Sequence, residues 1–122
     1  MARTVLQPSA QHPITIEPAS ARVTVEAGGT PVADTVAALA LQEAAYPTVY
    51  YIPLADVRSD VLKPSDHTTY CPYKGDASYY SIATAEGELT DAVWYYAEPY
   101  AAVAEIAGHV AFYANKVDII AT

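Results

Sequence analysis

Apolar and polar residues alternate along most of this chain, and that alternation constrains the fold more than any other feature. Ile14 and Ile16 flank a threonine, and Val23, Val25 and Ala27 are separated by Thr and Glu. Because successive side chains of a strand point to opposite faces of a sheet, a period of two is typical of half-buried β-strands. The sequence therefore predicts a mainly β fold.

Glycine and proline divide the chain into these strands. Gly28-Gly29 predicts a hairpin turn, because glycine adopts positive φ at little cost. Residues 36–45 have good helix propensity but also alternate, and we expect a strand because a hairpin turn precedes them. One short helix is expected between Pro99 and Gly108. The remaining strands are expected at 48–53, 67–73, 77–84, 89–97, 110–113 and 117–120.

Size and charge limit the classes of function. A chain of 122 residues can bury roughly two-thirds of its unfolded surface, so we expect residues 1–11 to form an N-terminal extension and 12–122 a compact single domain. Apolar runs are shorter than a membrane span, and the first residues lack an apolar signal core, which predicts a soluble cytoplasmic protein. With a net charge of −8 and scattered basic residues, neither nucleic acid nor membrane is expected as a partner.

The densest polar segment surrounds Cys71, the only cysteine. Pro72 removes a backbone donor, so this strand is expected to lie at a sheet edge or to bend. Lys74 is expected at an exposed turn, where its charge would favour the Cys71 thiolate. An enzyme would then use Cys71 as nucleophile, with Lys74 and Asp56 in catalytic roles. The alternative is a buried, inert cysteine and an Asp56 that caps a turn.

Tyrosine is abundant, with eleven in the chain. The pairs 50–51, 79–80 and 95–96 should each place one phenol on each face of the sheet. Our leading hypothesis is a pocket that binds an unknown small molecule, in which Lys74 contacts an anionic group; the alternative is that the rings only fill the core. Removing an exposed Lys74 should barely change stability, whereas pairing of Lys74 with Asp56 or Asp76 would count against the hypothesis. The residues expected to line the pocket are Tyr51, Cys71, Lys74, Tyr80, Trp94 and Tyr96.

One further class of function follows from the same residues. Exposed aromatic edges that pair between two copies would make the domain a self-associating module, and possible partners therefore include a homodimer. His12, His67, His109 and Cys71 lack the spacing of zinc ligands, so we expect no metal and no cofactor.

Three motifs carry a family resemblance. They are Tyr51-Ile-Pro-x-x-Asp56-Val57, Thr69-x-Cys-Pro-Tyr-Lys-Gly-x-Ala-x-Tyr79-Tyr80 and Trp94-x-Tyr96-x-x-Pro99, followed by Val110-Ala-Phe-Tyr113. From about His12 to Ile119, the chain resembles a bacterial and fungal family of domains of unknown function that carries a nucleotidyltransferase-like name. The resemblance implies a compact β-tent-like fold, similar to methionine sulfoxide reductase B and related zinc proteins.

The chemistry suggested by these names does not carry over to this chain. The zinc relatives use paired Cys-x-x-Cys motifs, which this sequence lacks. Nucleotidyl transfer needs closely placed carboxylates that hold Mg²⁺, and no Asp-x-Asp is present. The sequence therefore argues against nucleotidyl transfer.

Overall fold

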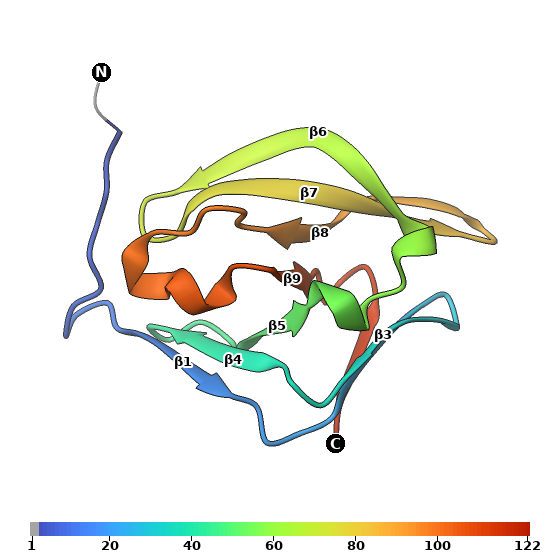
Figure 1. Ribbon diagram of the computed structural model, residues 1–122, viewed down its shortest axis with the longest axis horizontal. Helices are drawn as coiled ribbons and strands as arrows, with labels where there is room; N and C mark the ends of the chain where they lie inside the picture. Colours follow the sequence, from blue (N-terminus) through green and yellow to red (C-terminus); the bar gives the residue numbers. More distant parts are fainter. Residues whose placement is uncertain (1–2) are drawn as a thin grey trace.

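The computed structural model describes residues 3–122, and the chain folds as expected into a mainly β structure. Short connections separate the strands (Figure 1). The strands are β1 (Ile14–Pro18), β2 (Val23–Ala27), β3 (Thr30–Thr35), β4 (Leu39–Glu43), β5 (Val49–Pro53), β6 (Leu62–Cys71), β7 (Gly75–Thr84), β8 (Gly87–Tyr95), β9 (His109–Phe112) and β10 (Asp118–Ala121).

The strands form two antiparallel sheets. The larger sheet has seven strands in the order β1-β4-β5-β9-β8-β7-β6, so β1 and β6 are its edges (Figure 1). The smaller sheet has the order β10-β2-β3. β6 is an edge strand, as Pro72 predicted, but it spans residues 62–71 rather than the expected 67–73 and ends immediately before this proline.

Both faces of the seven-stranded sheet are covered. On one face, Ile52, Val93 and Val110 pack against Val23 and Val25 of the smaller sheet. On the other face, the residues in alternate positions form a second cluster that includes Leu41, Tyr51, Ala111 and the helical residues Val103 and Ile106. The expected division of the tyrosine pairs is confirmed, because Tyr50, Tyr80 and Tyr95 belong to the first cluster and Tyr51, Tyr79 and Tyr96 to the second.

The sequence signals for turns and strands hold in most places. Gly28 and Gly29 both have positive φ in the β2–β3 hairpin. Residues 39–43 of the ambiguous segment form β4, which confirms the choice of a strand. Tertiary pairing explains this outcome, because β4 is hydrogen-bonded to strands on both sides.

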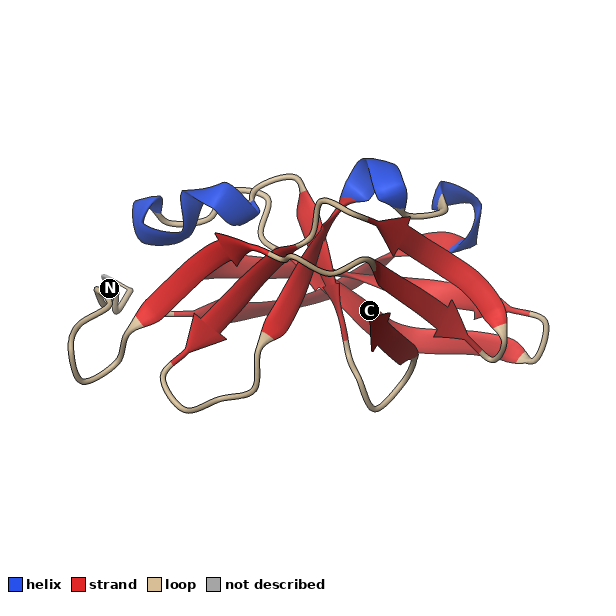
Figure 2. Ribbon diagram, turned by 90° about the horizontal axis from the view of Figure 1, so that it is seen from below, coloured by secondary structure: helices blue, strands red, loops and turns tan. Residues whose placement is uncertain are grey.

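The helical segments are short 3₁₀ turns: η1 (Leu54–Asp56), η2 (Ser59–Val61) and η3 (Ala101–Ile106). They lie together on one side of the strands (Figure 2). The expected C-terminal helix is therefore η3, and Val103 interrupts it with non-helical φ and ψ of −127° and 28°. Within residues 3–122, no helix is long and apolar enough to cross a membrane.

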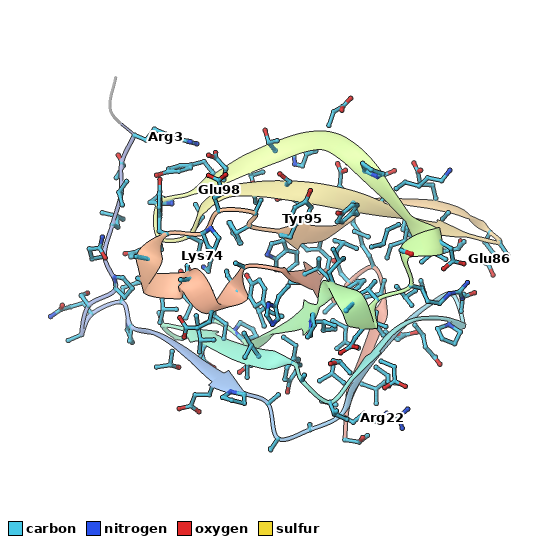
Figure 3. The ribbon with its side chains drawn as sticks, in the orientation of Figure 1. Arg3, Arg22, Lys74, Glu86, Tyr95 and Glu98 are labelled. Atoms are coloured by element: carbon cyan, nitrogen blue, oxygen red, sulfur yellow. The ribbon has the colours of Figure 1, made fainter. Side chains whose placement is uncertain are left out.

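The N-terminal segment, residues 3–12, lies against the turn between β6 and β7. Arg3 forms two hydrogen bonds of 2.6 and 2.7 Å with Asp76, and its guanidinium lies 3.7 Å from the centre of the Tyr70 ring. The Leu6 N–H donates to the carbonyl oxygen of Pro72 at 3.0 Å. Figure 3 shows Arg3 beside this turn, while Lys74 points from the turn into the molecule.

Candidate functional site

A cavity of about 410 Å³ opens on the face of the seven-stranded sheet that carries Tyr51 and Trp94. Its walls come from β4, β5, β7 and β8, from the turn between β4 and β5, and from residues next to the strand ends. Aromatic residues make up most of the lining. The lining residues are Leu41, Glu43, Tyr46, Pro47, Val49, Tyr51, Lys74, Tyr79, Trp94, Tyr96 and Tyr113.

Trp94 is the central wall of this cavity. The register of β7 and β8 places Tyr79 directly opposite Trp94, so both side chains lie on the same face. The Trp94 ring contacts Tyr113 with centroids 4.5 Å apart, and it meets Tyr51 edge-on at 6.4 Å. Trp94 is half-buried, so part of its surface remains available to a bound molecule.

The phenol of Tyr51 is an oriented donor in this wall. Its oxygen accepts a hydrogen bond from Trp94 Nε1 at 3.3 Å, which leaves the Tyr51 O–H proton free to donate. Burial raises the pKa of Tyr51 to about 12, and burial also raises the pKa of Tyr96. Both phenols therefore stay protonated at neutral pH.

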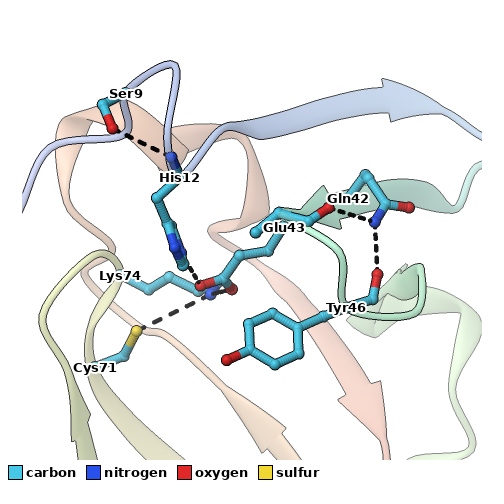
Figure 4. A network of polar contacts seen from close by, with 8 residues as sticks. Ser9, His12, Gln42, Glu43, Tyr46, Cys71 and Lys74 are labelled. Atoms are coloured by element: carbon cyan, nitrogen blue, oxygen red, sulfur yellow. Dashed lines mark hydrogen bonds and ion pairs between the residues drawn. The ribbon is translucent and has the colours of Figure 1, made fainter.

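An ion pair closes one end of the cavity. Lys74 is only 6% exposed, and its Nζ donates to Oε1 of Glu43. The other carboxylate oxygen, Oε2, lies 2.8 Å from Nε2 of His12 (Figure 4). The His12 ring stacks on Tyr73, with centroids 4.3 Å apart. This end of the cavity thus presents a carboxylate and an ammonium side by side.

The charge of Glu43 is maintained by these contacts. Burial alone would raise the pKa of Glu43, but the hydrogen bonds from Lys74 and His12 outweigh it and hold the pKa below the ordinary value of 4.5. Glu43 is therefore ionised at neutral pH, and its carboxylate offsets the charge of the Lys74 side chain that donates to it.

The turn between β4 and β5 supplies the mouth of the cavity. Gln42 Nε2 donates to the carbonyl oxygens of Ala44 and Tyr46 at 3.1 and 2.5 Å (Figure 4). Thr48 Oγ1 donates to Gln42 Oε1 at 2.9 Å. Ala44 is held at a positive φ of 47°. These contacts fix the turn, and Tyr46, which is 63% exposed, forms the rim of the cavity.

The structure brings four of the expected pocket residues together and separates the others. Tyr51, Lys74, Trp94 and Tyr96 line the cavity. Cys71 Sγ lies 4.0 Å from Lys74 Nζ but is not part of the lining. The expectation of an exposed Lys74 is wrong, because Lys74 is buried by its pairing with Glu43 rather than with Asp56 or Asp76.

Two expected site residues lie elsewhere. Tyr80 faces the opposite side of the sheet, where its ring stacks on Tyr95 with centroids 4.9 Å apart. Asp56 lies in η1 and accepts a hydrogen bond from Thr35 Oγ1 at 2.7 Å. That bond joins η1 to the end of β3, and it is not the turn cap that was the alternative in the sequence.

Sequence reasoning missed several residues of the site. Tyr79 and Tyr113 both lie in the family-like motifs, and Tyr79 occupies the strand position that Tyr80 was expected to fill. Only the register of β7 against β8 distinguishes these neighbours. For Glu43 and Tyr46 no local signal existed, since both contribute through folding of the β4–β5 turn.

The residues present at this site offer no cluster for a metal. Across residues 3–122, no three His, Cys, Asp or Glu side chains gather as metal ligands would. The chemistry available at the cavity is instead that of aromatic surfaces, phenolic hydroxyls and one ion pair.

Comparison with known proteins identifies a family. No curated protein matches the sequence. A family model named NTP_transf_9, described as a domain of unknown function (DUF427), matches residues 15–122. The match includes all ten strands except for the first residue of β1. The chain therefore belongs to the DUF427 family.

Proposed function

We propose that this domain binds a small molecule in the aromatic cavity, and that the molecule has a flat ring and no net charge. The observation that carries the proposal is the cavity itself, in which Trp94 and several tyrosines surround the Glu43–Lys74 pair. A cavity of about 410 Å³ has the size of a small-molecule site, and its few polar groups converge at one end, which is typical of such sites.

The aromatic rings favour a flat ligand. Trp94 is half-buried and tilted against Tyr113, so one indole surface faces open space. Aromatic pairs of this kind stabilise contacts by about 0.5–1.5 kcal/mol beyond their burial. A planar ring in the cavity would cover this surface and exclude water from it.

The ion pair favours a neutral ligand that both donates and accepts hydrogen bonds. Lys74 was expected to bind an anion, but Glu43 already neutralises its charge. An anionic group would meet the Glu43 carboxylate beside the ammonium, and a cationic group would meet Lys74. A primary amide has the matching pattern, since its N–H donates to a carboxylate and its carbonyl oxygen accepts from an ammonium.

Benzamide and benzoate provide a matched test of this proposal. They have the same shape, but one is neutral and the other anionic. Trp94 is the only tryptophan of the chain, so its fluorescence reports on the cavity. We expect benzamide to change the Trp94 emission saturably in the millimolar range, equivalent to about −4 kcal/mol. Benzoate should bind more weakly.

Two variants distinguish the cavity from nonspecific binding. Tyr51→Phe removes a hydroxyl inside the cavity, and Tyr80→Phe makes the same change on the opposite face of the sheet. We expect Tyr51→Phe to weaken benzamide binding several-fold and Tyr80→Phe to leave it unchanged. A response without saturation, or equal effects of the two variants, would reject the proposed function.

A further inference from the structure

We propose that the binding site continues into a second, more polar cavity, and that the ligand is a flat ring that carries a hydroxylated arm, as in an aryl glycoside. This inference rests on the proposed function of the aromatic cavity. The second cavity measures about 350 Å³. Its lining residues are His67, Tyr79, Asp91, Tyr113, Asn115 and Lys116.

Tyr79 and Tyr113 form the boundary between the two cavities, because they line both. Their hydroxyl oxygens are 3.5 Å apart, and the Tyr79 hydroxyl also contacts Thr69 Oγ1 at 2.8 Å. Among the described residues, 3–122, these two phenols are the only ones that line both cavities. A ring that stacks on Trp94 and Tyr113 would have its next substituent directed over these hydroxyls.

The second cavity has a carboxylate in a strained but firmly held position. Asp91 has a positive φ of 51°, which non-glycine residues rarely adopt. Its N–H donates to Ser81 Oγ at 2.9 Å, and its Oδ1 accepts from the Ser65 hydroxyl. Strained residues of this kind cluster at binding sites, where the surrounding structure fixes a side chain in a required direction. The remaining lone pairs of the carboxylate can accept from a ligand.

A positively charged side chain also lines the second cavity. Lys116 Nζ donates to the carbonyl oxygen of Thr90 at 2.7 Å and lies 5.7 Å from the centre of the Tyr113 ring. An ammonium has three donors, so this bond leaves two for a ligand. His67 packs on Tyr79 with ring centroids 4.6 Å apart, and its ring nitrogens add a further polar group.

These charges select the chemistry of the arm. A carboxylate or phosphate would be repelled by Asp91, and an ammonium would be repelled by Lys116. Hydroxyl groups avoid both penalties, because each one can donate to Asp91 and accept from Lys116. Several hydroxyls on one arm would satisfy Asp91, Lys116 and Asn115 together. A sugar joined to a flat ring combines this pattern with the stacking surface of Trp94.

The test compares phenol, methyl glycosides and phenyl glycosides, with Trp94 emission as the measurement. The panel contains the α and β forms of the glucoside, galactoside and mannoside. We expect at least one phenyl glycoside to bind about tenfold more tightly than both phenol and its own methyl glycoside. If no phenyl glycoside binds more tightly than phenol, the inference is wrong, although binding of phenol would still support the proposed function.

Two variants test whether the higher affinity for the phenyl glycoside comes from the second cavity. Asp91→Asn removes the charge but suits the left-handed backbone, since asparagine tolerates positive φ. Lys116→Met removes the exposed ammonium. Each should reduce the affinity for the phenyl glycoside towards that of phenol while phenol binding stays constant. Equal losses for phenol and glycoside would overturn the assignment of the arm to this cavity. Absence of any response to phenol and to all glycosides would reject both proposals.

Discussion

Substitution of Lys74 by methionine should destabilise the domain strongly. Methionine fills most of the volume of lysine but cannot pair with Glu43, whose side chain is only 18% exposed. Removing one partner of a buried ion pair leaves the other charge desolvated, which costs about 3–5 kcal/mol. Since His12 remains as a second partner of Glu43, we expect the lower end of that range. For a chain of 122 residues, a loss of about 3 kcal/mol lowers Tm by roughly 10–15 °C.

The assay is urea unfolding followed by circular dichroism, with Lys63→Met as the matched control. Lys63 is exposed, so its substitution should change stability by less than about 0.5 kcal/mol. Adding Glu43→Gln to Lys74→Met removes the unpaired charge and should restore at least about half of the loss. A loss below about 1 kcal/mol for Lys74→Met, or no recovery in the double variant, would refute the view that this pair is buried and coupled.

Three further predictions concern pH and backbone strain. Because the pKa of folded Glu43 lies below 4.5, ionised Glu43 stabilises the fold fully above that pH, and this stabilisation is lost as the pH falls. In the Glu43→Gln variant, the urea concentration at half-unfolding should therefore decrease less steeply between neutral and acidic pH. Burial raises the pKa of Tyr51 from 10.0 to about 12, so its protonated phenol favours the folded state until the pH rises through this interval. Tyr51→Phe removes the group that ionises on unfolding and should raise the pH at which the protein unfolds in alkali; an unchanged pH of unfolding would contradict this. Ala44 has a φ of 47°, and Ala44→Gly should raise the free energy of unfolding by about 0.5 kcal/mol in the same urea assay, whereas a loss would show that the turn carries no strain.

The alternation of residues was sufficient to predict the strands and the two-sided burial of the tyrosines. It could not determine the register between neighbouring strands, and for that reason Tyr80 was wrongly expected to line the pocket in place of Tyr79. Both residues are tyrosines, and only the pairing of Tyr79 with Trp94 shows which one faces the cavity.

The burial of Lys74 was also beyond local sequence reasoning. Its partner, Glu43, is 31 residues away in the chain, at the polar end of a strand that looks like an ordinary solvent-exposed terminus. The helix before Gly108 was expected from its boundary residues. The interval is too short for a stable α-helix, and the contacts of Val103 with the sheet favour an interrupted 3₁₀ segment instead.

The N-terminal segment makes this site sensitive to how the domain is trimmed. The family model begins at residue 15, yet His12 contacts Glu43 and Arg3 is bound to Asp76 beside the turn that carries Lys74. A protein that begins at residue 15 would lack His12, one of the two partners of the Glu43 carboxylate. It would also lack the Arg3–Asp76 ion pair beside that turn. A purification tag fused directly before Arg3 would be placed next to the same turn. Binding measurements are therefore best made on the full chain with any tag at the C-terminus, which follows β10, an edge strand of the smaller sheet.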